Sequence, residues 1–275
     1  MQLPIITKKQ AAKILNSKEK INISLNLEKT ESEIEIKKDY VIIKNQKIPK
    51  KEFKDLKDNV CYIIEEGKVK KMAWYSEVTE FYYKLYPTDD WPTITLSSTP
   101  MHRHANLSPK EDTKRKIEKI KPISGNVLDT CCGLGYTAIM SSKYAKKVHT
   151  FEKDSNVLYF AEFNPYSKDL FEKENIQVHN ENVKKGIESF KDNNFERIIH
   201  DPPTFKFAPE LFSKEFYKKL FRVLKNKGKI YHYAPWPQKS KGRVFYHKIV
   251  NNLKDIGFKD VRFDEYSCGV LAKKI

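Results

Sequence analysis

The sequence Asn-Val-Leu-Asp-Thr-Cys-Cys-Gly-Leu-Gly-Tyr-Thr-Ala, residues 126–138, is the stretch from which the fold can be inferred. A short apolar run ends at Asp129, Gly133 and Gly135 follow, and a helix-forming segment begins after them. Glycine has no Cβ, so the turn can adopt a positive φ and its backbone can lie close to a ligand. The order strand, tight turn, helix predicts the first βα unit of a nucleotide-binding α/β fold.

This stretch alone leaves the nucleotide open. Gly133, Gly135 and Ala138 also fit the dinucleotide pattern G-x-G-x-x-G/A. Two features favour a different cofactor. Asp129, just before the turn, could pair with an ammonium group but would repel a pyrophosphate. The sequence Asp-Pro-Pro-Thr-Phe at 201–205 is not one that a dehydrogenase requires.

Together with Glu152, these motifs resemble motifs I, II and IV of the class I S-adenosylmethionine (SAM) methyltransferases, over about residues 101–275. The resemblance implies a Rossmann-like α/β sheet with helices on both faces, and SAM as the cofactor. Glu152 also lies 19 residues after Gly133, close to the spacing at which an acid meets ribose hydroxyls. The implied cofactor-binding residues are Asp129, Cys131, Gly133, Gly135, Glu152, Lys153, Glu181, Asn182 and Asp201.

Around the motifs, short apolar runs alternate with helix-forming segments, which is typical of a parallel sheet. The predicted strands are 147–152, 176–179, 197–200 and 227–233, the predicted helices are 108–121, 155–163 and 213–224, and a closing hairpin is expected at 260–266 and 269–273. In open α/β sheets, ligands bind outside the carboxyl ends of the strands. We therefore expect four acids that follow strands to converge on one edge: Asp129, Glu152, Glu181 and Asp201.

The Asp-Pro-Pro loop suits transfer of a methyl group to an amine. Most of the catalysis in such a displacement comes from positioning the acceptor. Asp201 and the carbonyl of Pro202 could accept the amine hydrogens, while the prolines stiffen the loop. Methyltransferases that act on nucleobase nitrogens carry an aromatic residue next. Here Thr204 takes that place and Phe205 follows, which resembles a variant in some ribosomal-RNA methyltransferases. The predicted catalytic residues are Asp201, Pro202, Pro203 and Phe205.

Six residues are candidates for contact with the substrate: His102, Arg103, Thr204, His232, Trp236 and Arg243. His102 and Arg103 precede the first helix of the resemblance, in a segment that often lines the pocket in this family; the alternative is a solvated basic linker. His232 lies near the end of the fifth predicted strand and Trp236 follows that strand, so both could line the acceptor pocket. The alternative is that they pack at the edge of the sheet. Arg243 closes a basic run suited to phosphate.

Composition fits a nucleic-acid partner without requiring one. The chain has 275 residues and a formal net charge of +16, but only six of its 52 basic residues are arginine. Such a lysine excess can also reflect the lineage. No metal site is expected, because His102 and His104 lack a third ligand and the four cysteines lack zinc-ligand spacing. No apolar run reaches the length of a membrane span, and no signal peptide is evident, which predicts a cytoplasmic protein.

Residues 1–97 are expected to form a small β-rich domain before the SAM-binding domain at 98–275. A capped helix is predicted at 7–16, and a hairpin at 61–64 and 69–74. The end of this domain is dense in aromatic side chains, which could stack nucleobases or build the domain's core. They are Trp74, Tyr75, Phe81, Tyr82, Tyr83, Tyr86 and Trp91.

The whole chain most resembles a group of predicted archaeal methyltransferases. The sequence predicts a SAM-dependent methyltransferase that modifies a nitrogen of a nucleobase in tRNA or rRNA. Methylation of cytosine C5 is disfavoured, since neither loop after the fourth or fifth strand has a cysteine nucleophile. The alternatives are aminopropyl transfer to a polyamine, methylation of a protein or small molecule, and an RNA-binding module with a vestigial fold.

Overall fold

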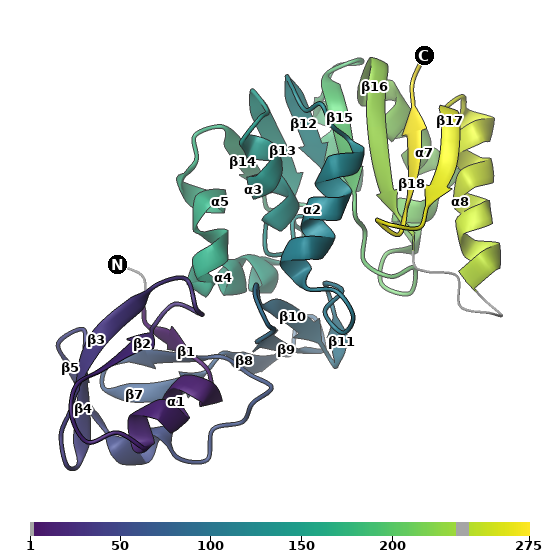
Figure 1. Ribbon diagram of the computed structural model, residues 1–275. Coiled ribbons are helices and arrows are strands. Elements are labelled where there is room, and N and C mark those ends of the chain that lie inside the picture. Colours follow the sequence, from purple (N-terminus) through teal and green to yellow (C-terminus); the bar gives the residue numbers. More distant parts are fainter. Residues whose placement is uncertain (1–2, 235–241) are drawn as a thin grey trace. The chain divides into compact units, whose positions relative to one another are not determined.

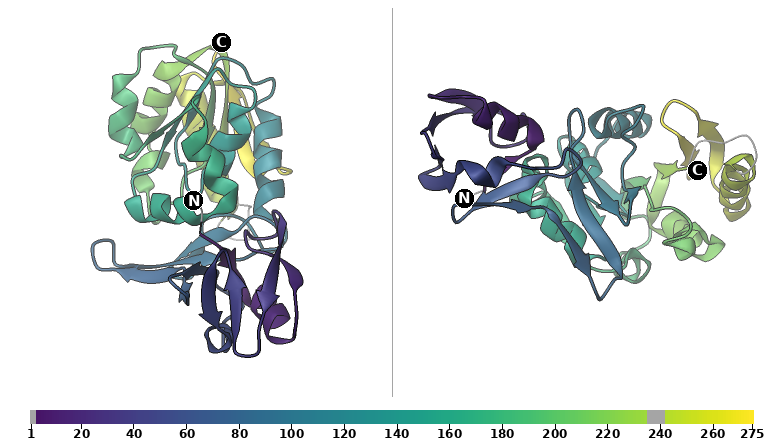
Figure 2. Two further views of the ribbon diagram at one scale, coloured as in Figure 1. Left: turned by 90° about the vertical axis from the view of Figure 1, so that its left-hand side faces the viewer. Right: turned by 90° about the horizontal axis from the view of Figure 1, so that it is seen from below.

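The computed structural model describes residues 3–234 and 242–275, without the side chains of 242–244. Its contacts divide the chain into two compact units (Figures 1 and 2). The N-terminal unit comprises Met1–Lys110 and Tyr159–Lys168, and the C-terminal unit comprises Glu111–Leu158 and Asp169–Ile275. The first unit thus extends past the boundary expected after residue 97, and it includes a segment that the sequence assigns to the second domain.

The N-terminal unit holds three small antiparallel sheets with the strand orders β1-β6-β7, β2-β3-β4-β5 and β11-β10-β9-β8. Its strands are β1 (Ile5–Ile6), β2 (Ile21–Ser24), β3 (Glu31–Ile36), β4 (Tyr40–Ile43), β5 (Gln46–Pro49), β6 (Tyr62–Glu65), β7 (Lys68–Lys71), β8 (Ala73–Ser76), β9 (Phe81–Tyr86), β10 (Thr93–Leu96) and β11 (Thr99–Pro100). A 3-10 helix spans Lys50–Phe53. The predicted β-rich character is confirmed.

Helix α1 (Lys8–Leu15) begins where the sequence predicts it. The Thr7 side chain accepts a hydrogen bond from Lys9 N, and the Gln10 side chain accepts one from Thr7 N, so the two form a capping box. Ala11 and Ile14 are buried in a core built with the strand residues of β2 to β6. Helix α1 therefore packs its apolar stripe against the small sheets.

The C-terminal unit is built on a seven-stranded sheet with the order β14-β13-β12-β15-β16-β18-β17. The first five of these strands run parallel, while β18 is antiparallel to both β16 and β17. The strands are β12 (Asn126–Asp129), β13 (Lys147–Phe151), β14 (Ile176–His179), β15 (Phe195–His200), β16 (Leu224–Tyr233), β17 (Lys259–Asp264) and β18 (Gly269–Lys273). This arrangement confirms the predicted Rossmann-like α/β sheet and its closing hairpin.

Helices cover both faces of this sheet (Figures 1 and 2). They are α2 (Pro109–Lys119), α3 (Tyr136–Ser142), α4 (Ser155–Phe163), α5 (Lys168–Glu172), α6 (Val183–Gly186), α7 (Lys214–Val223) and α8 (Gly242–Ile256), with 3-10 turns at Pro165–Ser167, Ile187–Ser189 and Pro209–Phe212. Ser213 caps α7 by accepting from Phe216 N at 3.1 Å. Phe216, Leu220 and Val223 then face the core that α7 and α8 share with the sheet.

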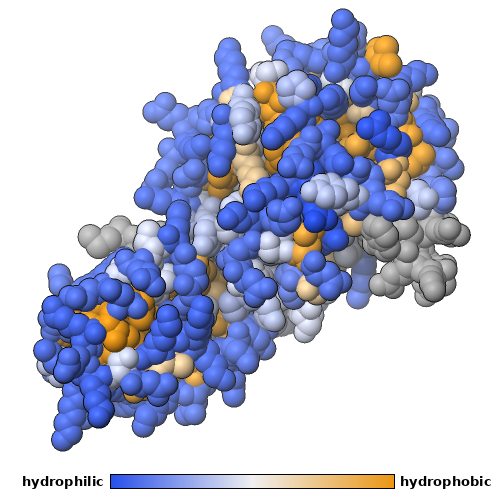
Figure 3. Space-filling model, in the orientation of Figure 1, coloured by the Kyte–Doolittle hydropathy of each residue, from blue (hydrophilic) through white to orange (hydrophobic). Residues whose placement is uncertain are grey.

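Two element boundaries differ from the predictions for local reasons. Strand β16 begins at Leu224 rather than at residue 227, because Leu224, the C-cap of α7, is already extended. The run expected as one strand at 69–74 is split at Met72, and β7 and β8 belong to different sheets. The surface seen in Figure 3 is mostly hydrophilic, with apolar groups in small separate areas.

Candidate functional site

Three acids meet at the carboxyl edge of the parallel strands. Asp129 ends β12, Glu152 follows β13 and Asp201 follows β15. In the sheet register, Asp129 lies opposite Thr150 on β13 and opposite Ile199 on β15. The structure therefore brings the acids of the three sequence motifs to one place.

Asp129 is fully buried, and its two carboxylate oxygens differ in their surroundings. Oδ2 accepts hydrogen bonds from Thr137 Oγ1 at 3.0 Å and from Thr150 Oγ1 at 2.9 Å. Oδ1 has no hydrogen-bond partner among the residues that the structure describes. Burial raises the pKa of Asp129 to about 7. A buried acceptor of this kind suits a donor or cation supplied by a ligand.

The glycine turn joins this acid to the next one. Gly133 and Gly135 have φ of 54° and 80°, in the region that favours glycine. Gly133 N donates to Glu152 Oε2 at 3.0 Å, and Gly135 N donates to Cys132 O at 2.8 Å. A Cβ on Gly135 would lie 2.7 Å from Leu170 Cδ2, so the second glycine also allows close packing. Cys131 lies between Asp129 and the turn, half-buried.

Glu152 is half-buried and holds the loop that follows β13. Its Oε1 accepts from Asp154 N at 3.0 Å, while burial raises its pKa to about 7. Each carboxylate oxygen keeps a further lone pair, so Glu152 can still accept from ligand hydroxyls. The neighbouring Lys153 is exposed.

The third acid is paired with a lysine that the sequence analysis missed. Lys116 Nζ on α2 lies 2.6 Å from Asp201 Oδ2 and 2.7 Å from Asp112 Oδ2, and the Lys116 side chain is 5% exposed. Burial opposes the charged form of Lys116, but the two carboxylates raise its pKa overall. Burial raises the pKa of Asp201, and Lys116 acts against that rise. Lys116 thus acts as the buried counter-ion of Asp201.

The loop after Asp201 passes from the interior to the surface. Pro202 is buried, Pro203 is half-buried, and Thr204 and Phe205 are exposed. Phe205 is 46% exposed, and its ring centroid lies 5.7 Å from that of Phe212. The loop therefore offers an acid at its base and an accessible aromatic ring beyond it.

Two other candidates near the strand ends have structural partners. Asn182 caps α6 by accepting from Lys184 N at 2.9 Å. Glu181 is exposed, with Oε1 3.9 Å from His179 Nδ1. Glu181 follows β14 as expected, but its side chain is exposed and contacts His179 rather than the acids Asp129, Glu152 and Asp201.

The structure corrects the expectation that His232 lines an acceptor pocket. His232 is fully buried on β16, and its Nε2 lies 2.7 Å from Tyr217 OH on α7. Its Nδ1 lies 2.6 Å from Tyr233 O, and burial lowers its pKa to about 4. The alternation of β16 directs this side chain into the core, where both ring nitrogens already have partners.

Two of the remaining candidates belong to the N-terminal unit, and the side chains of the other two lie outside what the structure describes. Trp236 lies outside the described residues, as does the side chain of Arg243 at the start of α8. His102 and Arg103 belong to the N-terminal unit, where His102 Nδ1 lies 2.9 Å from Thr93 Oγ1.

Over residues 3–234 and 242–275, no group of three or more His, Cys, Asp or Glu side chains is arranged to hold a metal ion. The four cysteines are free thiols. None of the described helices combines the length and the apolar character that a membrane crossing requires.

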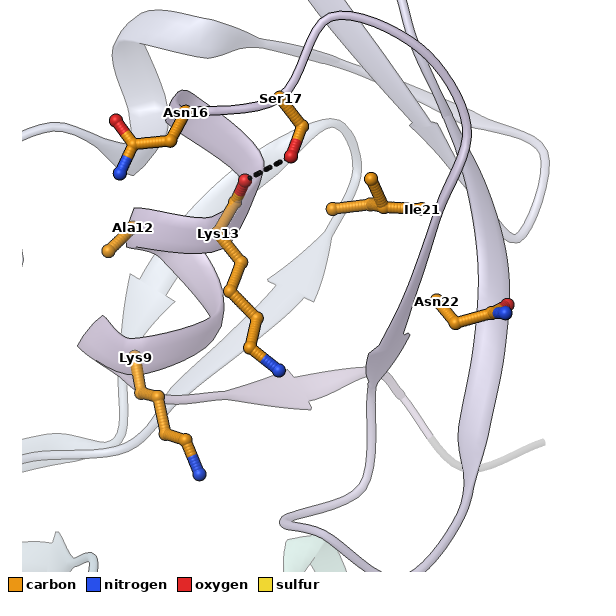
Figure 4. A pocket seen from close by; sticks show the side chains of 7 residues that line it. All are labelled: Lys9, Ala12, Lys13, Asn16, Ser17, Ile21 and Asn22. Atoms are coloured by element: carbon orange, nitrogen blue, oxygen red, sulfur yellow. Dashed lines mark hydrogen bonds between the residues drawn. The ribbon is translucent and has the colours of Figure 1, made fainter.

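A pocket in the N-terminal unit is formed by α1 and β2 (Figure 4). It is lined by Lys9, Ala12, Lys13, Asn16, Ser17, Ile21 and Asn22. The lining contains no acid and no aromatic ring, and Ser17 Oγ already donates to Lys13 O at 2.7 Å. These side chains do not form a catalytic arrangement.

Comparison with known proteins shows the family of this chain. Residues 113–250 match the family model described as methyltransferase small domain. The chain is 41% identical, over 98% of its length and 95% of the relative's, to an uncharacterised protein of Methanocaldococcus jannaschii.

Solved structures share the fold at low sequence identity. A spermidine synthase in complex with the transition-state analogue AdoDATO superposes with a TM-score of 0.60 at 18% identity, covering 74% of this chain and 73% of the other. The spermidine synthase of Thermotoga maritima gives a TM-score of 0.56 at 16% identity, covering 73% and 70%.

Proposed function

The chain belongs to the methyltransferase small domain family and is a SAM-dependent methyltransferase, and from this premise we propose that it methylates a nitrogen atom of a nucleobase in RNA. The proposal has two parts, a cofactor site at the acids of β12 and β13 and an acceptor site at the loop after β15. The observation that carries it is the half-buried Asp201, paired with the buried Lys116, at the base of a Pro-Pro loop that ends in an exposed phenylalanine.

The residues at the first two strand ends fit SAM. When bound, SAM supplies an electrophilic methyl group. The free Oδ1 of Asp129 would accept from the cofactor's ammonium group. Glu152 would accept from the ribose hydroxyls, and the turn at Gly133 and Gly135 would let the backbone lie close to the cofactor. Cys131, Lys153 and Asn182 are proposed to line the same site.

Asp201 would receive the acceptor amine. Its Oδ2 is held by Lys116, which leaves Oδ1 to accept an amine hydrogen. That hydrogen bond would aim the nitrogen lone pair, and the Pro202 carbonyl would accept the second hydrogen of an exocyclic amine. Phe205 could stack on the base, since every nucleobase has an aromatic face. The net charge of +16 favours a polyanionic substrate.

Transfer of tritiated methyl from SAM to RNA of cells that lack the gene tests the proposal. Asp201→Asn should lower the rate by at least about 100-fold while SAM still binds, because the acceptor loses its alignment. The matched control is Asp255→Asn, which removes an exposed acid paired with Lys214 on the surface. Unchanged transfer by the Asp201 variant would remove Asp201 from the acceptor site.

Aminopropyl transfer to a polyamine is the second candidate, and the spermidine synthase folds above are the observation that favours it. A polyamine needs free carboxylates, whereas Asp201 is already paired with Lys116. Binding of SAM compared with decarboxylated SAM separates the two: preference for the decarboxylated form would favour aminopropyl transfer.

A further inference from the structure

The sheet β8–β11 in the N-terminal unit has two different faces. On one face, Trp74 stacks on Phe160 with ring centroids 4.1 Å apart and an interplanar angle of 10°. Tyr83, opposite Trp74 in the register, is fully buried on the same side. This face belongs to the core of the unit.

The other face carries tyrosines that reach solvent. Tyr75 on β8 lies directly opposite Tyr82 on β9, so both side chains project from the same face. They are 57% and 44% exposed. Strand alternation places Lys84 and Tyr86 in line with Tyr82 on this face. We name these four residues the tyrosine face.

Basic side chains accompany the tyrosine face. Lys84 Nζ lies 5.4 Å from the centroid of the Tyr86 ring, and the Tyr86 ring lies 5.2 Å from that of His104. Tyr86 is opposite Thr93, whose hydroxyl is hydrogen-bonded to His102. The basic segment 102–104 therefore lies beside Tyr86, where β9 pairs with β10. Exposed rings beside cationic groups are the combination that single-stranded nucleic acids bind.

We propose that the tyrosine face is a docking surface for a single-stranded segment of RNA, with bases stacked on Tyr75 and Tyr82 and phosphates near Lys84. This inference rests on the proposed function, since it assigns part of the RNA to the N-terminal unit. A protein partner is disfavoured because Lys84 lies between Tyr82 and Tyr86 on this face, and lysine is depleted in protein–protein interfaces.

The test is binding of a fluorescein-labelled single-stranded RNA of about a dozen nucleotides, followed by anisotropy at low salt. Tyr75→Ala/Tyr82→Ala should weaken binding by at least about 30-fold, the product of two stacking losses at the low end of their range. Tyr75→Phe/Tyr82→Phe keeps both rings and should bind within about twofold of the wild type. The control is Tyr144→Ala, an equally exposed tyrosine of the C-terminal unit.

The outcomes separate this inference from the proposed function. If the wild-type protein binds RNA and the double alanine variant binds equally well, the tyrosine face is not the docking surface, and the RNA substrate stands. If both double variants lose affinity alike, the rings do not act by stacking and the inference fails. If the wild-type protein does not bind RNA at all, the proposed substrate fails together with it.

Discussion

At the carboxyl edge of the sheet, two acidic residues lie in surroundings that disfavour the ionised form of their side chains. Burial holds the pKa of Asp129 and of Glu152 at about 7. Asp129 ends a strand that parallel pairing with β13 fixes in place, and Glu152 is held by hydrogen bonds from Gly133 N and Asp154 N. A cationic ligand would relieve this cost, which links cofactor binding to protonation.

The affinity for SAM should therefore depend on pH. In the free protein Asp129 is mostly protonated below pH 7 and cannot pair with an ammonium group. Because the bound cation favours the ionised form, affinity should fall by up to about tenfold per pH unit as the pH drops from about 7 to 5. Calorimetric titration across this range measures the change, with Asp129→Asn as the control, which should bind SAM more weakly and with a smaller dependence on pH. Constant wild-type affinity would contradict the role of Asp129.

The lysine beside the acceptor acid gives a second prediction at this scale. Lys116→Met would leave the buried Asp112 and the half-buried Asp201 without their shared counter-ion, and the pKa of Asp201 would rise further. Since Asp201 must be ionised to accept from the amine, the acid limb of the pH–rate profile should move to higher pH. Breaking this buried pair should also lower the free energy of unfolding by about 3–5 kcal/mol.

The matched control for Lys116 lies one helical turn away. Lys119 on the same helix pairs with Asp264 at 2.8 Å and is 25% exposed. Lys119→Met should leave the pH–rate profile unchanged, and Asp112→Asn should partly rescue the Lys116 variant by removing one of the two acids. A Lys116 variant whose profile matches the wild type would rule out a positioning role.

At the scale of helices and strands, the sequence correctly predicts the elements whose formation depends on local patterns of residues. The strand β14 and helices α1 and α4 lie where periodicity and caps place them. Lys116 was missed because α2 is rich in charged residues and because its pairing with Asp201 joins residues distant in the sequence. His232 was misplaced because only its register on β16 decides which way it points. The aromatic run at 74–86 contributes to the core on one face of its sheet, as one of the two expectations held, and exposes Tyr75 and Tyr82 on the other face.

A substitution in the turn before α3 tests why this turn needs glycine at position 135. Gly135→Ala should lower the free energy of unfolding by about 1–3 kcal/mol, because φ is +80° and the new Cβ would meet Leu170. Chemical denaturation measures the loss. Adding Leu170→Ala to the variant removes the close contact but not the backbone strain, so a double-mutant cycle separates the two causes. A neutral Gly135→Ala would contradict the geometry of the turn.

The whole molecule combines a methyltransferase sheet, a β-rich unit and a strong positive charge. The family and the fold could be predicted from the order of motifs along the chain. The substrate could not, because lysine excess has the same appearance whether it binds RNA or reflects the lineage. The boundaries between the two units could not be predicted from local sequence patterns either. Residues 159–168 belong to the N-terminal unit through contacts with residues that are distant in the sequence.

The salt dependence of RNA binding shows whether the positive charge of the chain serves RNA binding or only reflects the composition of its lineage. If RNA is bound through about five phosphate contacts, its affinity should fall about 100-fold between 50 and 200 mM salt, as counterions are released. Anisotropy titrations at several salt concentrations give the slope, with SAM binding as the internal control that should change little. A flat response for RNA would mean that the charge does not serve RNA binding.

The most direct test of the central claim is mass spectrometry of nucleosides from RNA incubated with the protein and SAM that carries a deuterated methyl group. The RNA comes from cells that lack the gene. The account predicts one labelled nucleoside with the deuterated methyl on a base nitrogen, formed by the wild type and not by Asp201→Asn. A label on ribose or on a base carbon, or no labelled nucleoside at all, would contradict it.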